Sequence, residues 1–238
     1  MLPNQRSNFR RARFTTLGLR LHLDASLPAT VIRDGSNFVS AWNDKSGAGR
    51  HMVQATQANK PQFQVTGLGG LGAIQFDGVD DFMTFSDQTL AYIAGRSFTV
   101  FYVASKPANN NTWIFGGTNT GTRTNFFAGN LTANTHRTGF YNDDQGSIVT
   151  AAASGTTEIY TIVYDSSNNQ RTIRRNRVEV SRAVTSGSVA SMTGQAIGRY
   201  VSSYGNFKIG EFLIYDRALQ FAEQETVEKD LISKWSIV

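Results

Sequence analysis

The sequence has no cysteine, and only 3 histidines and 4 prolines occur among its 238 residues. Without cysteine, the chain forms no disulfide scaffold, holds no cysteine-ligated zinc and has no thiol nucleophile. No apolar run approaches the length of a membrane-spanning helix, and only 17% of the residues are charged. We therefore expect one domain with a sizeable hydrophobic core and no membrane among its partners.

The abundant residues, 22 glycines and 16 phenylalanines, are typical of short strands joined by turns. Leu19 to Asp24 alternates apolar and polar residues and predicts the first strand. Ser97 to Ser105 and Glu158 to Asp165 are apolar on both faces, which predicts central strands with one face on the core and the other on a concave aromatic surface. Phe221 to Trp235 has helical spacing. The predicted fold is all-β, an antiparallel two-sheet jelly-roll sandwich with a short C-terminal helix and an N-terminal arm.

The net charge of +5 comes largely from the N-terminal arm, because several arginines and no acidic residue precede Asp24. The rest of the chain is nearly neutral, so we expect no nucleic acid partner. No apolar segment follows the arginines, so no secretory signal is predicted. We divide the chain into a basic arm, residues 1–18, and a jelly-roll domain, residues 19–238. The arm has too little apolar surface to fold alone. We expect it to dock on a neighbouring subunit through Arg6, Phe9, Arg10, Arg11, Arg13 and Phe14.

The segment from Ala73 to Phe85 predicts a strand, an acidic turn and a second strand, joined as a hairpin. The turn contains Asp77, Asp80 and Asp81, whose like charges repel one another. Two interpretations remain open. The three carboxylates gather a calcium ion, or they cap a closed structural turn. The expected cofactor is therefore either none or calcium.

Five short motifs follow one another along the chain. They are L-H-L-D-A-S from Leu21 to Ser26, W-N-D-K-S-G-A-G-R-H from Trp42 to His51, F-D-G-V-D-D-F from Phe76 to Phe82, I-G-E-F-L-I-Y-D-R-A-L from Ile209 to Leu219, and K-W at Lys234 and Trp235. In this order they resemble the laminin-G-like branch of the concanavalin A-like jelly rolls. The resemblance implies the fold but no single function, because the family includes sugar-binding modules, adhesion domains, enzyme appendages and virion components.

No catalytic residue is predicted. The jelly-roll glucanases carry two glutamates and an aspartate on one strand as E-x-D-x-E, and this sequence has no such pattern. Glu211 stands in a predicted strand without an acidic neighbour in sequence, so we expect it to be structural. The histidines, His22, His51 and His136, are scattered without the spacing of a zinc site.

Five aromatic residues in or beside predicted loops could stack on sugar rings or form a protein contact. They are Tyr92, Trp113, Tyr141, Tyr200 and Tyr204. We expect a non-catalytic virion structural protein, a head or tail decoration or assembly component of a bacteriophage, that docks through its basic arm. Its partners would be other virion proteins and copies of itself, and it would reach the virion after synthesis in the host cytoplasm. The alternative is a carbohydrate-binding or adhesion module that recognises host or environmental glycans.

Overall fold

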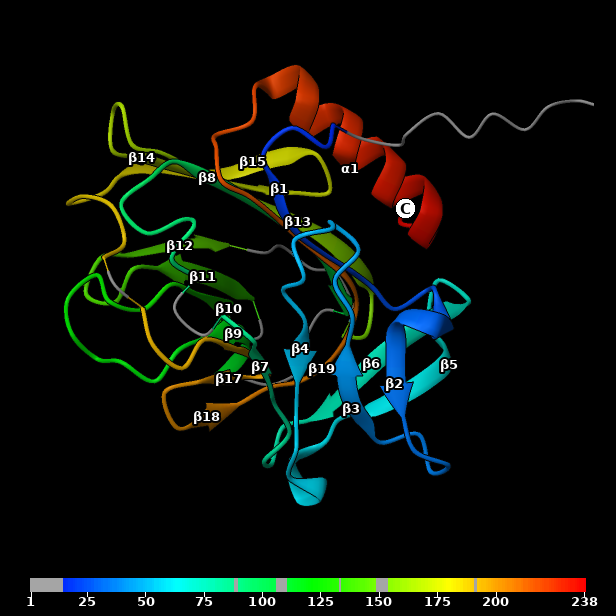
Figure 1. Cartoon of the computed structure of the whole chain (residues 1–238). Coiled ribbons are helices and arrows are strands. Elements are labelled where there is room, and N and C mark those ends of the chain that lie inside the picture. Colours follow the sequence, from blue (N-terminus) through cyan, green and yellow to red (C-terminus); the bar gives the residue numbers. More distant parts are fainter. Residues whose placement is uncertain (1–14, 88–89, 106–110, 133, 149–153, 191) are drawn as a thin grey trace, which may run out of the picture.

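The computed structural model describes residues 15–87, 90–105, 111–132, 134–148, 154–190 and 192–238. These residues form two packed antiparallel sheets, a small hairpin and one helix (Figure 1). The arrangement confirms the predicted all-β sandwich with a C-terminal helix. The division into an arm and a domain stays a prediction, because the arm up to residue 14 lies outside the described residues.

Sheet A has the strand order β15-β14-β13-β8-β19-β6-β5. Strand β1 also pairs with β19, along the same edge as β6. Its strands are β1 (Leu19–Asp24), β5 (Gln62–Leu68), β6 (Leu71–Asp77), β8 (Phe98–Ser105), β13 (Thr157–Asp165), β14 (Gln170–Arg175), β15 (Val178–Val184) and β19 (Asn206–Tyr215). Strand β19 pairs with β8 along its other edge. It therefore holds the first strand and the middle of the chain in one sheet.

Sheet B has the strand order β12-β11-β10-β9-β16-β7-β4-β3-β2. Its strands are β2 (Val31–Arg33), β3 (Val39–Trp42), β4 (Met52–Val53), β7 (Met83–Phe85), β9 (Thr112–Gly116), β10 (Phe127–Thr132), β11 (Thr135–Gly139), β12 (Asp144–Ile148) and β16 (Ala196–Ile197). A separate hairpin joins β17 (Arg199–Tyr200) to β18 (Ser203–Tyr204), and two 3-10 turns are η1 (Pro28–Thr30) and η2 (Gln57–Asn59). Sheet B thus supplies the second layer.

The main core lies between the two sheets and consists largely of aromatic rings. The ring centroids of Phe98 and Phe126 are 4.8 Å apart, and those of Phe115 and Phe212 are 5.4 Å apart. Phe115 also meets Tyr102 edge to face at 6.1 Å. Each fully buried ring of this size stabilises the fold by about 1.5–3 kcal/mol. The phenylalanine-rich composition therefore becomes the layer that joins the sheets.

A second core lies between the outer face of sheet A and helix α1 (Phe221–Trp235), which Figure 1 shows outside the sandwich. It contains Phe101, Val103, Leu213 and Tyr215 from β8 and β19, and Val227, Leu231 and Trp235 from α1. This second core explains why the central strands are apolar on both faces. The prediction that their outer face lines a concave aromatic surface is wrong there, because the apolar stripe of α1 covers that face.

Helix α1 is bounded by its own side chains and backbone. The carboxylate of Glu223 accepts a hydrogen bond of 2.9 Å from the backbone N–H of Gln220, just before the first turn. Ser236 ends the helix in the left-handed region, with φ of 53°. In the described part of the chain, no helix is long and apolar enough to cross a membrane.

The acidic turn joins two sheets and not two strands of one hairpin. Strand β6 pairs with β5 and β19 in sheet A, whereas β7 pairs with β4 and β16 in sheet B. The hairpin predicted for this segment is therefore wrong. Both edges of β6 are already occupied, so the chain after Asp77 has to cross to the other layer before it can pair again.

Candidate functional site

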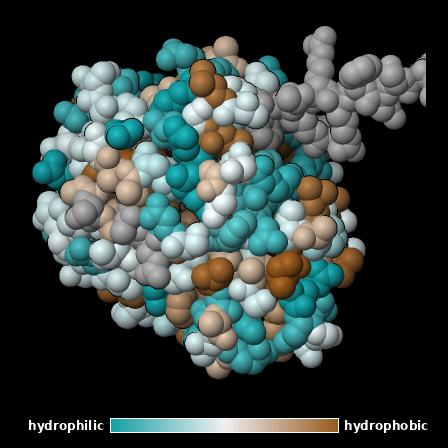
Figure 2. Space-filling view, viewed as in Figure 1, coloured by the Kyte–Doolittle hydropathy of each residue, from teal (hydrophilic) through white to brown (hydrophobic). Residues whose placement is uncertain are grey.

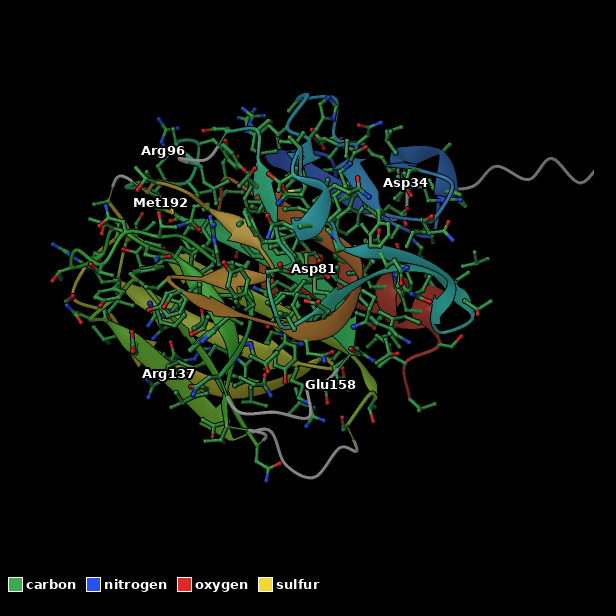
Figure 3. The ribbon with its side chains drawn as sticks, turned by 90° about the horizontal axis from the view of Figure 1, so that it is seen from below. Asp34, Asp81, Arg96, Arg137, Glu158 and Met192 are labelled. Atoms are coloured by element: carbon green, nitrogen blue, oxygen red, sulfur yellow. The ribbon has the colours of Figure 1, made fainter. Side chains whose placement is uncertain are left out.

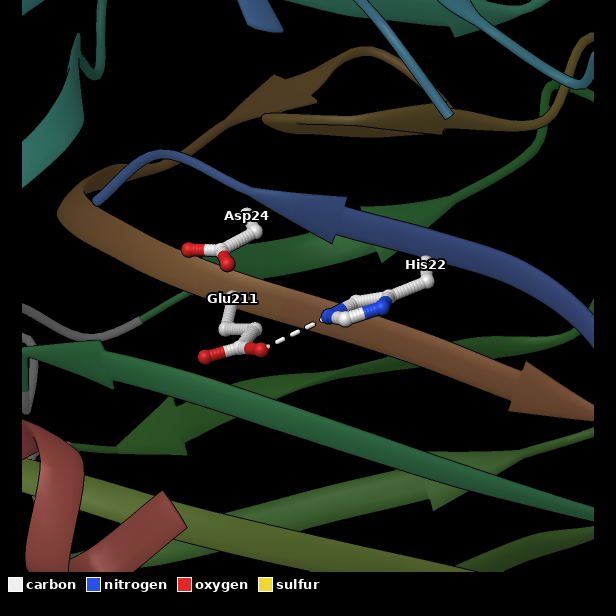
Figure 4. A group of neighbouring side chains, drawn as sticks. All are labelled: His22, Asp24 and Glu211. Atoms are coloured by element: carbon white, nitrogen blue, oxygen red, sulfur yellow. Dashed lines mark hydrogen bonds and ion pairs between the residues drawn. The ribbon is translucent and has the colours of Figure 1, made fainter. Parts of the chain in front are cut away.

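Four of the five sequence motifs converge on one buried polar cluster beneath the end of helix α1. We call it the Glu211 network and define it as His22, Asp24, Lys45, Glu211, Lys234 and Trp235. His22 and Asp24 extend from the same side of β1, and Glu211 lies opposite Asp24 in the pairing of β1 with β19. Figure 4 shows these three side chains together. The pairing of β1 with β19 therefore brings together residues that are far apart in sequence.

Both carboxylate oxygens of Glu211 are engaged. His22 Nε2 lies 2.7 Å from Oε1, while Lys234 Nζ at 2.6 Å and Trp235 Nε1 at 2.7 Å donate to Oε2. The Glu211 side chain is 2% exposed. These partners support the expectation that Glu211 is structural, and they show an acidic neighbour, Asp24, that the sequence did not reveal.

Asp24 is held by two ammonium groups. Lys234 Nζ donates to Oδ1 and Lys45 Nζ donates to Oδ2, each at 2.7 Å. Burial raises the pKa of Asp24, but Lys234, Lys45 and the Ser26 hydroxyl outweigh it and hold the pKa at about 2. Candidate ligand atoms of His22, Asp24 and Glu211 lie within 4.8 Å of one another. The Lys234 ammonium binds both carboxylates, so this cluster is a closed structural junction.

The acidic turn gathers its three carboxylates, whose oxygens lie within 4.8 Å of one another. Asp77 Oδ1 accepts the backbone N–H of Val79 at 2.8 Å, and Asp81 Oδ2 accepts that of Asp77 at 3.1 Å. Asp81 is buried; this burial and the neighbouring Asp77 raise its pKa to about 7. Among the described residues, no cation forms an ion pair with Asp77, Asp80 or Asp81. The backbone hydrogen bonds show the caps of a structural turn, and the gathered oxygens are of the type that calcium binds.

The five predicted contact aromatics do not form one surface. Tyr200 lies 4.6 Å from Trp113 and 6.4 Å from Tyr141, measured between ring centroids, so these three come together. Tyr204 packs instead beside Phe82, and Tyr92 lies under the guanidinium of Arg50. Trp113 is only 6% exposed and cannot offer a free ring face.

The three joined rings form part of a surface that we call the aromatic patch, on the outer face of sheet B. It consists of Trp113, Phe127, Arg137, Tyr141, Asp144 and Tyr200. The hairpin β17–β18 packs on β9, which places the Tyr200 ring 4.4 Å from that of Phe127. A Cβ on Gly116 would lie 2.7 Å from the Tyr200 ring, so the glycine backbone makes room for it. The local sequence thus builds a half-buried aromatic platform.

Charged groups border this platform. Arg137 Nη1 donates to Asp144 Oδ2 at 3.2 Å, and the two side chains are 34% and 35% exposed. Burial raises the pKa of Asp144, although Arg137 and Arg171 oppose this. Arg137 Nε is buried and has no hydrogen-bond partner among the described residues. Sequence reasoning missed Arg137 and Asp144, because only the hairpin of β11 with β12 brings them together.

The patch and the acidic turn are separate places. Figure 3 shows Arg137 and Asp81 in different parts of the molecule. On the face seen in Figure 2, hydrophobic side chains form small separate groups among hydrophilic ones. The described residues on this face therefore form no broad apolar area.

The assembly residues predicted in the arm lie outside the described residues, namely Arg6, Phe9, Arg10, Arg11, Arg13 and Phe14. The base of the arm is described. The Tyr215 hydroxyl donates to the carbonyl of Thr15, and Arg217 Nε donates to the carbonyl of Leu17, each at 3.0 Å. These bonds fix the base beside the end of β19.

No protein-family model and no curated protein sequence matches this chain. Solved structures do resemble it. Trypanosoma rangeli sialidase in complex with 2,3-difluorosialic acid has a TM-score of 0.62 at 12% identity, over 93% of this chain and 34% of the sialidase. The binding domain of botulinum neurotoxin DC in complex with SialylT has a TM-score of 0.58 at 12% identity, over 91% of this chain and 52% of that domain. The serotype D binding domain has a TM-score of 0.61 at 9% identity, with coverages of 90% and 51%.

This chain therefore spans about a third of the sialidase and about half of each toxin domain. At such low identities the likeness concerns the fold alone. Together with the two antiparallel sheets, it shows that the chain has a β-sandwich fold.

Proposed function

We propose that this chain is a non-catalytic carbohydrate-binding module of the laminin-G-like kind, and that the aromatic patch binds the glycan. The observation that carries the proposal is the half-buried pair Tyr141 and Tyr200 beside the ion pair of Arg137 with Asp144. An aromatic ring covers the apolar face of a sugar, and a few placed polar groups bond its hydroxyls. Both elements meet on the patch.

Sialylated glycans are the first ligands to test. The sialidase and the neurotoxin DC domain have 2,3-difluorosialic acid and SialylT in their complexes. Arg137 suits an acidic sugar, since a guanidinium binds a carboxylate through paired N–H groups and only Nη1 is used by Asp144.

We propose that the module is non-catalytic because its buried glutamate carboxylates are already bound by other side chains. Glu211 is closed by three partners, and Glu158 and Glu228 are buried against Arg175 and Arg174. Among the described residues, the other cluster of three carboxylates is that of the acidic turn. Release of free sugar from a glycoside, abolished in Asp81→Asn, would contradict this part.

Binding of 3′-sialyllactose, measured by isothermal titration, tests the site. We expect Tyr141→Ala and Arg137→Gln each to weaken binding at least tenfold, with lactose binding more weakly than 3′-sialyllactose. Tyr204→Ala is the matched control, because it removes a half-exposed tyrosine that lies outside the patch, on the hairpin that carries Tyr200. Equal binding by all variants, at an unchanged melting temperature, would place the ligand elsewhere.

A second candidate function is virion assembly, as part of a bacteriophage head or tail decoration. What favours it is the basic arm whose base is tied beside β19 by Tyr215 and Arg217 and not by strand pairing. An arm held this way can reach a neighbouring subunit without disturbing the sandwich. Its location would then be the virion, and its partners other virion proteins and copies of itself. Sedimentation of the purified chain tests self-association: a monomer at every concentration would count against contacts between copies.

A further inference from the structure

A groove lies on the outer face of sheet A, beside the N-terminal end of helix α1. Its volume is about 210 Å³. The floor and one wall come from β13, β14 and β15, and the other wall comes from the segment leading into α1 and from the first turn of α1. The lining residues are Val163, Asp165, Gln170, Thr172, Arg174, Glu179, Arg182, Ala218, Leu219, Gln220, Phe221 and Gln224. We call this feature the helix-side groove.

The Phe221 ring lies at the edge of the groove and is supported by Arg174. Phe221 is 63% exposed although it is the first residue of α1. The Arg174 guanidinium lies 4.9 Å from the centre of its ring, and that guanidinium is itself held by Glu225 and Glu228. The ring therefore stands at the mouth of the groove with one face supported by a cation.

Several polar atoms of the residues that line the groove form no hydrogen bond with any of the described residues. The acceptors among them are Asp165 Oδ2 and Gln224 Oε1, and the donors are Gln170 Nε2, Arg174 Nη1 and the Thr172 hydroxyl, which can also accept. A ligand that satisfies this set must both donate and accept hydrogen bonds. Hydroxyl groups do both, whereas a phosphate only accepts and an ammonium only donates.

The charges that line the groove also favour a neutral ligand. Asp165 and Glu179 balance Arg174 and Arg182 around the groove, and Glu179 pairs with Arg182 directly. A site without net charge gives no advantage to an anion or a cation over a neutral molecule.

We propose that the helix-side groove is a second carbohydrate site, which takes one neutral pyranose ring stacked on Phe221. Its hydroxyls bond Asp165, Gln170 and Thr172, and its volume admits a group no larger than a single sugar. The groove lies on the outer face of sheet A and the aromatic patch on the outer face of sheet B. The chain would therefore bridge two glycans from opposite faces, with different chemistry on each face.

The test titrates the full chain with methyl glycosides of glucose, galactose, mannose and N-acetylglucosamine, followed by amide chemical shifts. We expect at least one glycoside to shift the amides of Thr172 and Phe221. Phe221→Ala should weaken that binding at least tenfold, and Gln170→Ala at least threefold. Val65→Ala, a change of similar exposure on β5 away from the groove, should leave it unchanged.

Two results would overturn the proposal. One is that none of the four glycosides shifts the groove amides. The other is that the shifts survive Phe221→Ala but disappear in Tyr141→Ala, which would assign the sugar to the aromatic patch. Loss of 3′-sialyllactose binding in the patch variants, with the groove titration intact, would separate the two sites. Loss of groove binding alone would leave the proposed function standing.

Discussion

Lys234 takes the place that a bound cation would need between Asp24 and Glu211. Its Nζ lies 2.7 Å from one carboxylate and 2.6 Å from the other. Lys234→Met would leave both acids buried without this ammonium, and we expect a loss of about 3–5 kcal/mol in the free energy of unfolding. The folded pKa of Asp24, about 2, lies below its ordinary 3.8, so its stabilisation is present above pH 3.8 and is lost as pH falls through 2. Urea unfolding at pH 7 and pH 3 measures both effects.

Lys229→Met is the matched control for this prediction. Lys229 is 60% exposed and pairs with Glu225 at 3.6 Å on the helix surface. Such a pair contributes no more than about 0.5 kcal/mol. An equally small change in both variants would show that Lys234 is not needed at the junction.

Asp81 gives the opposite pH dependence. Its folded pKa of about 7 lies above the ordinary 3.8, so the native state binds the extra proton between these values. The stability that Asp81 contributes is therefore complete below pH 3.8 and is lost as pH rises through 7. We expect Asp81→Asn to be more stable than the parent by about 1–3 kcal/mol at pH 8 and similar to it at pH 4. Thermal unfolding at the two pH values tests this prediction. If Asp81→Asn were less stable than the parent at pH 8, the raised pKa of Asp81 would be contradicted.

Helix α1 packs closely on β19 where the Trp235 ring lies against Gly210. A Cβ on Gly210 would lie 2.4 Å from the Trp235 ring, so Gly210→Ala has to push the helix or the ring away. We expect a loss of about 1–3 kcal/mol and a change in tryptophan fluorescence. Gly35→Ala is the control, because a Cβ there meets nothing within 4 Å. Equal stability of the two variants would mean that α1 repacks without cost.

Strand β14 carries two arginines that are buried, whereas charged side chains usually lie on the surface. Arg171 and Arg174 are 1% and 4% exposed. Arg171 donates to Gln145 of sheet B, whereas Arg174 binds Glu228 of α1. The strand therefore ties the two layers and the helix together with charged groups whose partners lie far away in sequence.

At the scale of the whole molecule, the described residues form a sandwich, and the base of the predicted arm is bound beside the end of β19. The described contacts of the arm begin at Thr15. Deleting residues 2–14 removes none of them, so we expect a melting temperature within about 2 °C of the parent, as for a change worth less than 0.5 kcal/mol. The same deletion should abolish incorporation into the parent assembly, measured by co-sedimentation. A truncated chain that unfolds would instead make the arm part of the sandwich, and normal assembly would show that the arm does not dock on a neighbouring subunit.

The sequence by itself determined the elements whose pattern is local. Two-fold alternation in β1, two-sided apolar runs in β8 and β13, and the helical stripe of α1 each follow from neighbouring residues. The fold class follows from these elements, because such strands can bury both faces only in a layered structure.

Only the tertiary structure decided which distant residues meet. His22 and Glu211 are 189 residues apart, and Asp24 and Lys234 are 210 apart, so no local pattern could have paired them. The crossing of the acidic turn from sheet A to sheet B, the patch around Tyr200 and the helix-side groove depend in the same way on strand order. Strand order is set by the total packing of the chain, in which each edge can be used once, and a single segment does not carry that information.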